Sequence, residues 1–176
     1  MLKDAKYLFA YVAPLMAFIA IYFGGFWSWA GLVFAFVIIP TLEFFTPKST
    51  QNFSESEEQS RLANLYFDAI LYLNLPIHFA LVWFYFSTIQ AGGLELYEIM
   101  GMTASVGIVV GTIGINVAHE LGHRHKKYEQ WMSKALLMTA LYMHFFVEHN
   151  RGHHKYVATE RDPATSRFGE TIYAFW

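Results

Sequence analysis

Residues 99–118 read IMGMTASVGIVVGTIGINVA and contain no charged side chain. A helix needs roughly 17–25 mainly apolar residues to cross about 30 Å of hydrocarbon. Similar uncharged runs occupy three earlier segments: Tyr7–Phe23, Phe26–Leu42 and Ala69–Ile89. The sequence therefore predicts an all-α, polytopic membrane helical bundle with four spans.

The composition of the 176-residue chain supports this prediction and excludes several other classes. Hydrophobic residues make up 55% and charged residues only 15%, whereas soluble domains average about 25% charged residues. A formal net charge of -2 provides no basic face for nucleic acid. The chain has no cysteine, which excludes disulfides, Cys-ligated zinc and iron–sulfur clusters held within it. Any metal ligand must therefore be nitrogen or oxygen.

The distribution of basic residues predicts the orientation in the membrane. Gly24-Gly25 and Gln90–Glu98 contain neither Lys nor Arg, whereas basic residues occur before the first run, between the second and third, and after the fourth. Because basic loops favour the cytosol, the N terminus, the loop 46–64 and everything after Ala118 are predicted to be cytosolic. We therefore expect a four-span bundle over 1–118 and a cytosolic-face metal-binding region over 119–176.

A fifth apolar stretch, Ala135–Val147, is too short for a comfortable crossing. Histidines occur before and after this stretch. They can share one metal site only if both ends of the stretch lie on the same side of the membrane. We expect a helix packed at the boundary between membrane and cytosol.

Seven of the eight histidines lie after residue 118, and the first group ends the fourth span. His119 and His123 are separated by four residues in the stretch HELGHRH. On a helix this spacing puts both imidazoles on one face, about 5–6 Å apart at Cβ. The pair can bind one ion or face two.

The second group lies in Glu148–His154, which reads EHNRGHH. His149 and His153 again have the i,i+4 spacing, and His154 lies about 100° further around an α-helix. Neutral imidazole suits iron, zinc, copper and nickel. The sequence therefore predicts one transition-metal site with these ligands: His119, His123, His149, His153 and His154.

Other polar residues near the two groups have plainer interpretations. Glu120 and Glu148 can accept the free ring N–H of a ligand histidine, or pair with neighbouring arginines. His125 is predicted to be solvated, and His144 to be buried and hydrogen-bonded. His78, inside the third span, is predicted to make a buried polar contact between helices.

The stretches His119–Arg124 and Glu148–His154 most sharply, and nearly the whole chain with them, resemble the integral-membrane alkane 1-monooxygenases (alkane hydroxylases). The later Asp162-Pro163 and Arg167–Glu170 also resemble this family. These enzymes belong with fatty-acid desaturases and hydroxylases in the histidine-box superfamily. The resemblance implies two iron ions in a non-haem di-iron centre, bound by the five predicted histidines at the cytoplasmic face of a bacterial inner membrane. It also implies O2 as oxidant, rubredoxin as electron donor, and insertion of one oxygen atom at the terminal carbon of medium- to long-chain alkanes taken from the bilayer.

The sequence departs from this family in one respect. Such enzymes have a third histidine box, a further histidine and more membrane helices, whereas this sequence ends at Trp176 without them. Five ligands are too few for two irons. We therefore expect the N-terminal part of a longer protein, inactive alone, or a partner chain that supplies the missing ligands.

Three other functions share some of these features. A membrane zinc metalloprotease would use HELGH with Glu120 as general base, although a catalytic zinc needs only three protein ligands. A membrane fatty-acid desaturase or another hydrocarbon hydroxylase would use the same boxes. A metal transporter or sensor would bind the ion without catalysis.

Overall fold

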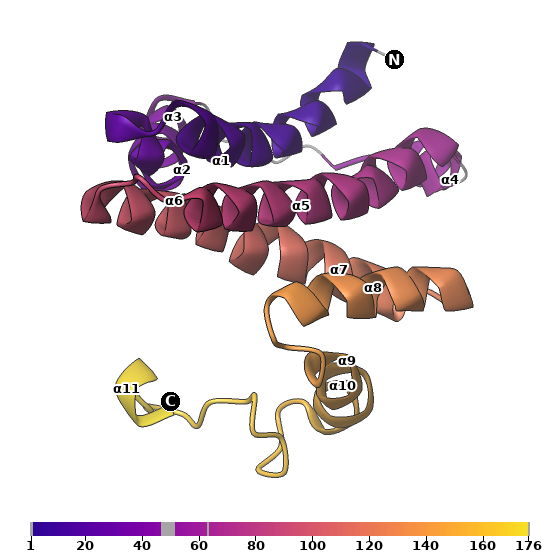
Figure 1. Cartoon of the computed structure of the whole chain (residues 1–176). Helices are drawn as coiled ribbons and strands as arrows, with labels where there is room; N and C mark the ends of the chain where they lie inside the picture. The colour runs from indigo at the N-terminus through magenta and orange to yellow at the C-terminus, as the bar shows by residue number, and fades with distance from the viewer. Residues whose placement is uncertain (1, 47–51, 63, 176) are drawn as a thin grey trace. The chain divides into compact units, whose positions relative to one another are not determined.

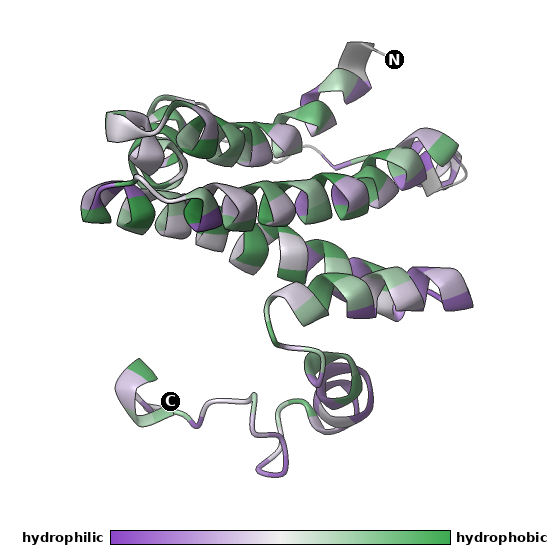
Figure 2. Cartoon of the chain, viewed as in Figure 1, coloured by the Kyte–Doolittle hydropathy of each residue, from purple (hydrophilic) through white to green (hydrophobic). Residues whose placement is uncertain are grey.

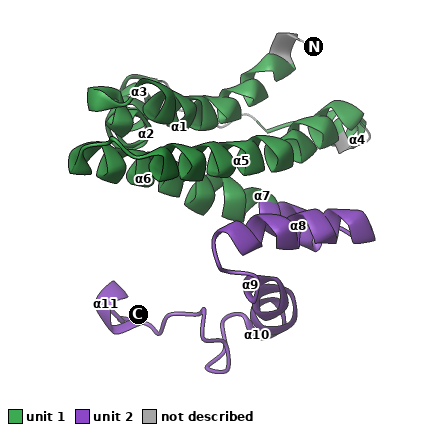
Figure 3. Ribbon diagram, in the orientation of Figure 1, with its two compact units in different colours: residues 1–117 green, residues 118–176 purple. Residues whose placement is uncertain are grey.

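The computed structural model describes residues 2–46, 52–62 and 64–175. These described ranges form helices and turns and contain no β-strand, so the predicted all-α class is confirmed. The chain divides into two compact units, Met1–Val117 and Ala118–Trp176 (Figure 3).

The first unit consists of long helical runs (Figure 1), in which α-helical, 3₁₀ and π segments follow one another. In chain order its elements are η1 (Leu2–Tyr11), α1 (Val12–Phe23), η2 (Gly25–Trp29), α2 (Ala30–Val33), η3 (Phe34–Ile38), α3 (Ile39–Phe45), α4 (Glu55–Leu62), α5 (Leu65–Ala91), α6 (Leu96–Val109) and η4 (Val110–Gly114). The next helix, α7 (Ile115–His123), contains the boundary between the units.

Four helical runs are long and apolar enough to cross a membrane: Asp4–Phe23, Gly25–Phe45, Leu65–Ala91 and Leu96–His123. The four predicted spans are therefore confirmed as candidate membrane helices. Large apolar side chains on them are exposed, as at Phe26 (92%) and Trp83 (72%), and hydrophobic residues dominate these ribbons (Figure 2). Exposed apolar surface on this scale is unfavourable in water and suits hydrocarbon.

Small residues allow the helices of the first unit to approach closely. The hydroxyl of Ser105 donates to the backbone carbonyl of Ser28 at 2.8 Å and accepts the N–H of Gly31 at 3.1 Å. A Cβ on Gly31 would lie 2.8 Å from the Cβ of Ser105, and one on Gly101 would lie 2.9 Å from the backbone carbon of Ser28. Packing through small residues and interhelical hydrogen bonds is typical of membrane helices.

The second unit has shorter elements joined by turns. They are α8 (Lys127–Thr139), α9 (Phe145–Val147), η5 (Glu148–His153), α10 (His154–Tyr156) and α11 (Ile172–Phe175). From α9 to α10 the helix is continuous, and its middle turn is a π-helical turn.

The predicted single helix over Ala135–Val147 is wrong. Helix α8 ends at Thr139 and the next helix begins only at Phe145. Between them Leu141 has a φ of 54°, a left-handed conformation that a helix cannot contain, and the N–H of Tyr142 donates to the carbonyl of Leu137 at 2.9 Å. Beyond this turn, the rings of Phe145 and His149 lie 6.2 and 4.4 Å from the ring of His119 in α7.

Candidate metal centre

Helix α7 positions the first pair of histidines. Because His119 and His123 are one turn apart on this helix, their Nε2 atoms lie 3.0 Å from each other. Helix α8 fixes this end of α7, since the hydroxyl of Ser133 donates to the carbonyl of Ala118 at 2.6 Å. A Cβ on Gly122 would lie 3.1 Å from the Ser133 Oγ, so glycine permits the close approach.

A buried ion pair holds the turn that follows α7. The guanidinium of Arg124 lies 3.0 Å from the carboxylate of Glu129, and Glu129 is only 1% exposed. The side-chain amide of Gln130 donates to the carbonyl of Arg124 at 2.9 Å. A buried carboxylate requires such a partner, so these contacts rigidly connect the histidine helix to α8.

The second pair of histidines comes from the π-helical turn η5. The N–H of His154 donates to the carbonyl of His149, which closes a turn of five residues instead of four. The Nε2 atoms of His149 and His154 consequently lie 2.9 Å apart. The spacing in an α-helix predicts His149 and His153 on one face, whereas the π-turn brings His149 and His154 together.

The two pairs meet in one cluster. The Nε2 of His149 lies 2.7 Å from that of His119 and 3.2 Å from that of His123. One ligand atom from each of His119, His123, His149 and His154 lies within 4.8 Å of the others. Four converging imidazole nitrogens match the donor set that iron, zinc, copper and nickel prefer, so these residues fit a transition-metal ion.

His149 is the central member of this four-histidine cluster. Its ring stacks on Phe145, with ring centroids 4.7 Å apart and planes 16° apart. Burial, followed by the charges of the neighbouring histidines, lowers the pKa of His149 to about 4. The imidazole is therefore neutral near pH 7, and a neutral ring has the lone pair that a metal needs.

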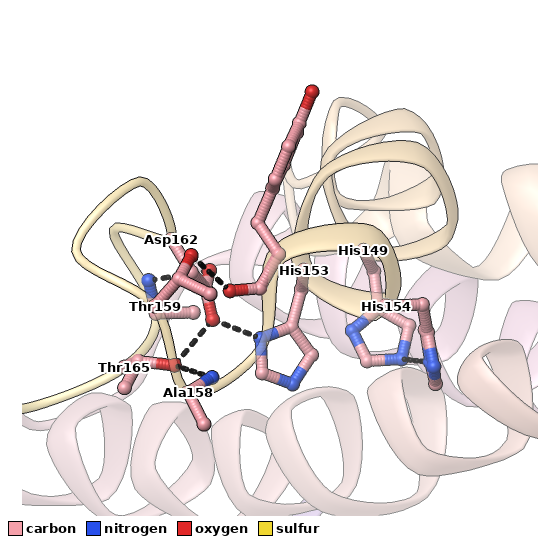
Figure 4. A network of polar contacts seen from close by, with 9 residues as sticks. His149, His153, His154, Ala158, Thr159, Asp162 and Thr165 are labelled. Carbon is pink, nitrogen blue, oxygen red and sulfur yellow. Dashed lines mark hydrogen bonds and ion pairs between the residues drawn. The ribbon is translucent and has the colours of Figure 1, made fainter.

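His153 lies outside the four-histidine cluster and faces a carboxylate instead (Figure 4). Its Nδ1 is 2.8 Å from Oδ2 of Asp162, a residue that is only 3% exposed. The hydrogen bond from the Thr165 hydroxyl is the largest of several contacts that lower the pKa of Asp162, so the carboxylate is ionised at neutral pH.

Asp162 was given no role in the sequence analysis. It lies nine residues after His153 in the chain, and its position after a histidine box, in a stretch that resembles the family, was the signal for a contact. Of the five predicted ligands, the structure thus brings four together and places His153 on Asp162.

The two glutamates beside the boxes make other contacts. Glu120 is 56% exposed in its side chain and lies 3.4 Å from the Nε of Arg124. The carboxylate of Glu148 is 70% exposed and lies 4.0 Å from the Nε2 of His144. The pairing of Glu120 with arginine corresponds to the second of the two interpretations made from the sequence.

The remaining histidines lie apart from the four-histidine cluster. His125 is exposed, as predicted. His144 was predicted to be buried, but its side chain is 57% exposed, because the helix expected around it is replaced by a turn. His78 is buried at 1% exposure in α5, as predicted, and a Cβ on Gly114 of η4 would lie 2.9 Å from its ring.

Comparisons with known proteins point to one group of membrane enzymes. Residues 97–176 match the family model described as Fatty acid desaturase. The chain is 38% identical over 152 residues to Alkane 1-monooxygenase 1 of Alcanivorax borkumensis, an alignment that covers 85% of this chain and 37% of that protein. It is 37% identical over 147 residues to Alkane 1-monooxygenase of Pseudomonas putida, with 82% of this chain and 36% of that protein covered.

A shorter alignment gives a higher identity. Alkane 1-monooxygenase of Ectopseudomonas oleovorans is 43% identical over 110 residues, which cover 62% of this chain and 27% of that protein. The chain thus spans well under half the length of these three relatives. Residues 97–176 thus match the fatty acid desaturase family model, and the chain is similar over most of its length to proteins named alkane 1-monooxygenase.

Proposed function

We propose that this chain forms part of a membrane alkane 1-monooxygenase with a non-haem di-iron centre. The single observation that supports this most directly is the convergence of four histidine Nε2 atoms from two boxes within 4.8 Å. The similarity to named alkane 1-monooxygenases supplies the reaction class. The reaction would insert one oxygen atom of O2 at the terminal carbon of a medium- to long-chain alkane.

The substrate explains why a metal is needed. An alkane C–H bond has no charge, no acidic proton and no hydrogen-bonding group, so acid–base or nucleophilic catalysis has nothing to act on. Bound iron would supply redox chemistry with O2, and the protein supplies binding, orientation and electrostatics. His119, His123, His149 and His154 would hold one iron, and Phe145 would shield the His149 ring from water.

The first unit offers apolar surface for such a substrate. A groove of about 620 Å³ is lined by α1 and α5. Its lining is almost entirely apolar and includes Pro14, Leu15, Phe18, Trp83 and Phe84. A hydrocarbon dissolved in the bilayer can enter such a groove without losing hydrogen bonds to water.

The proposal includes a location and an electron donor. The basic residues of the loops favour an inner-membrane protein whose N terminus and histidine boxes face the cytoplasm. A soluble rubredoxin on that side would supply the electrons.

Labelling of single cysteines, introduced at Lys127 and at Gly92, by a membrane-impermeant thiol reagent tests the orientation: we expect Lys127→Cys to react only after cell lysis. Reaction of Lys127→Cys in intact cells would contradict it.

The metal and the product test the function itself. Metal analysis of the purified full-length enzyme, of which this chain would form part, should give about two iron ions per chain, and one zinc would contradict the proposal. Membranes that contain this full-length enzyme, supplied with octane, O2, rubredoxin and its reductase, should form 1-octanol. The His149→Gln variant should form none, whereas the variant His144→Gln should retain the activity.

A second candidate is a membrane fatty-acid desaturase or another hydrocarbon hydroxylase, which the match to the Fatty acid desaturase model favours. Formation of an alkene bond in a fatty acyl substrate, without 1-octanol, would support it. The zinc protease has less support, because Glu120 pairs with Arg124 and the four-histidine cluster has one histidine more than a catalytic zinc needs.

A further inference from the structure

Asp162 is a buried carboxylate whose hydrogen bonds converge on one histidine. Its Oδ2 accepts from Nδ1 of His153 at 2.8 Å and from the hydroxyl of Thr165, and its Oδ1 accepts the N–H of Ala164 at 3.0 Å. The Asp162 side chain has no exposed surface. A carboxylate in this position is an acceptor only, so the proton between the two residues belongs to Nδ1 of His153.

This contact fixes the tautomer of His153. A neutral imidazole has one N–H, and with Nδ1 as donor the lone pair is on Nε2. Figure 4 shows the second ring nitrogen of His153 directed away from Asp162. Histidines that bind metals commonly donate their other ring N–H to a carboxylate in this way, which orients the ring and makes the ligand nitrogen more basic.

The lone pair of His153 is available next to the four-histidine cluster. The ring of His153 lies parallel to that of His149, with centroids 5.4 Å apart, and 5.7 Å from the ring of His154. Yet His153 is not among the residues whose ligand atoms converge. Its ring therefore lies beside the four-histidine cluster but outside it.

The loop that carries Asp162 is shaped by the same residues. The N–H of Ala158 donates to the Thr165 Oγ1 at 3.0 Å, and the N–H of Asp162 donates to the carbonyl of Thr159 at 3.2 Å. The N–H of Thr165 donates to the carbonyl of Asp162, also at 3.2 Å. These bonds hold the carboxylate in place independently of any metal.

We propose that Asp162 is a positioning residue, which holds the His153 ring so that its Nε2 binds the second metal ion of the centre. This inference rests on the proposed metal centre and adds a function for a carboxylate outside both histidine boxes. Asp162 acts through His153 and does not itself contact the ion.

Histidine tautomers in the metal-free protein test the first step. In ¹⁵N-histidine-labelled protein in lipid nanodiscs, long-range ¹H–¹⁵N correlations report which ring nitrogen bears the proton, and His153→Gln identifies the signal. We expect His153 to be protonated on Nδ1 in the wild type. An Nε2-protonated His153 would overturn the proposal, and this measurement requires no substitution at Asp162.

Titration with Co(II) alone tests the second step. In the wild type we expect a tight and a weaker equivalent, and Asp162→Asn should weaken the second by about 10–100-fold while leaving the first unchanged. Glu160→Gln, which removes a nearby exposed carboxylate, should leave both unchanged. Equal binding by Asp162→Asn and the wild type would overturn the role of Asp162, whereas failure of the wild type to bind Co(II) would overturn the metal centre itself.

Discussion

The Nε2 atoms of His149 and His154 lie 2.9 Å apart because a π-helical turn separates the two residues. In an α-helix, positions i and i+5 point about 140° apart. The wider π-turn brings them onto one face, and such turns occur frequently at functional sites. The same turn directs His153, between them, towards Asp162. One local change of helix type thus divides a run of histidines between two environments.

Removal of the central histidine should abolish metal binding. His149→Gln deletes the nitrogen that lies 2.7, 3.2 and 2.9 Å from those of the other three histidines. We expect affinity to fall by more than the roughly 10–100-fold that the loss of an outer-shell partner costs. Co(II) absorption titrations of the purified protein measure this. His144→Gln, at an exposed site, is the matched control, and equal losses in both variants would argue against the four-histidine cluster.

The metal-free protein should lose stability in mildly acidic solution. The pKa of His149 is about 4 in the folded protein, against about 6.5 in an unfolded chain. Between these values the unfolded state binds more protons, so this contribution to the free energy of unfolding is complete above about pH 6.5 and falls as the pH drops towards 4. Thermal unfolding midpoints across this range measure it.

The pH dependence has an internal control. His149→Gln removes the titrating group, so the variant should show a shallower decrease between pH 6.5 and 4 than the wild type. Identical slopes would mean that His149 does not carry the effect.

Helix packing in the first unit should tolerate no side chain at Gly101. A Cβ there would lie 2.3 Å from the Ser28 Oγ and 2.9 Å from its backbone carbon. We expect Gly101→Ala to destabilise the protein by about 1–3 kcal/mol through overpacking. Gly107→Ala, on the same helix with open space around the new Cβ, should be neutral or slightly stabilising. Thermal unfolding in one detergent compares the two, and an equally stable Gly101→Ala would contradict the close approach.

The ion pair between Arg124 and Glu129, which follows α7, should stabilise the folded protein. Arg124→Met removes the guanidinium 3.0 Å from a carboxylate that is 1% exposed. Loss of one partner of a buried pair costs about 3–5 kcal/mol, and we expect the lower end because Arg124 is 28% exposed in its side chain.

The double variant Arg124→Met, Glu129→Met tests the cause of that loss. It replaces both charges by apolar groups, so it should regain much of the stability. If the double variant is as unstable as Arg124→Met, the loss comes from packing rather than from an unpaired charge.

Much of the fold could be predicted because it depends on local properties of the chain. The uncharged run over Ile99–Ala118 has the length and apolar character of a membrane helix wherever it is placed, and the structure has a helical run over Leu96–His123. The spacing of His119 and His123 likewise determines their common face once the helix exists. Both hydropathy and helical period can be read from the residues of one segment alone.

Two features of the second unit were not determined locally. Nothing in the letters EHNRGHH distinguishes an α-turn from the π-turn that pairs His149 with His154, because the two helix types differ by one hydrogen-bond register. The turn at Leu141 was also missed, since an apolar stretch favours a continuous helix until contacts elsewhere reverse the chain.

The sequence by itself thus determined the membrane helices, the metal-binding residue types and the face shared by His119 and His123. The sequence also predicted that all five histidines of the two boxes share one site, and only the tertiary structure decided that four of them, His154 included, converge while His153 turns to Asp162. The physical reason is the separation along the chain of the residues that interact. The hydropathy and helical period of a segment depend on residues close together in the sequence. A metal site instead needs side chains that are 30 residues apart, such as His119 and His149, and tertiary packing fixes their positions.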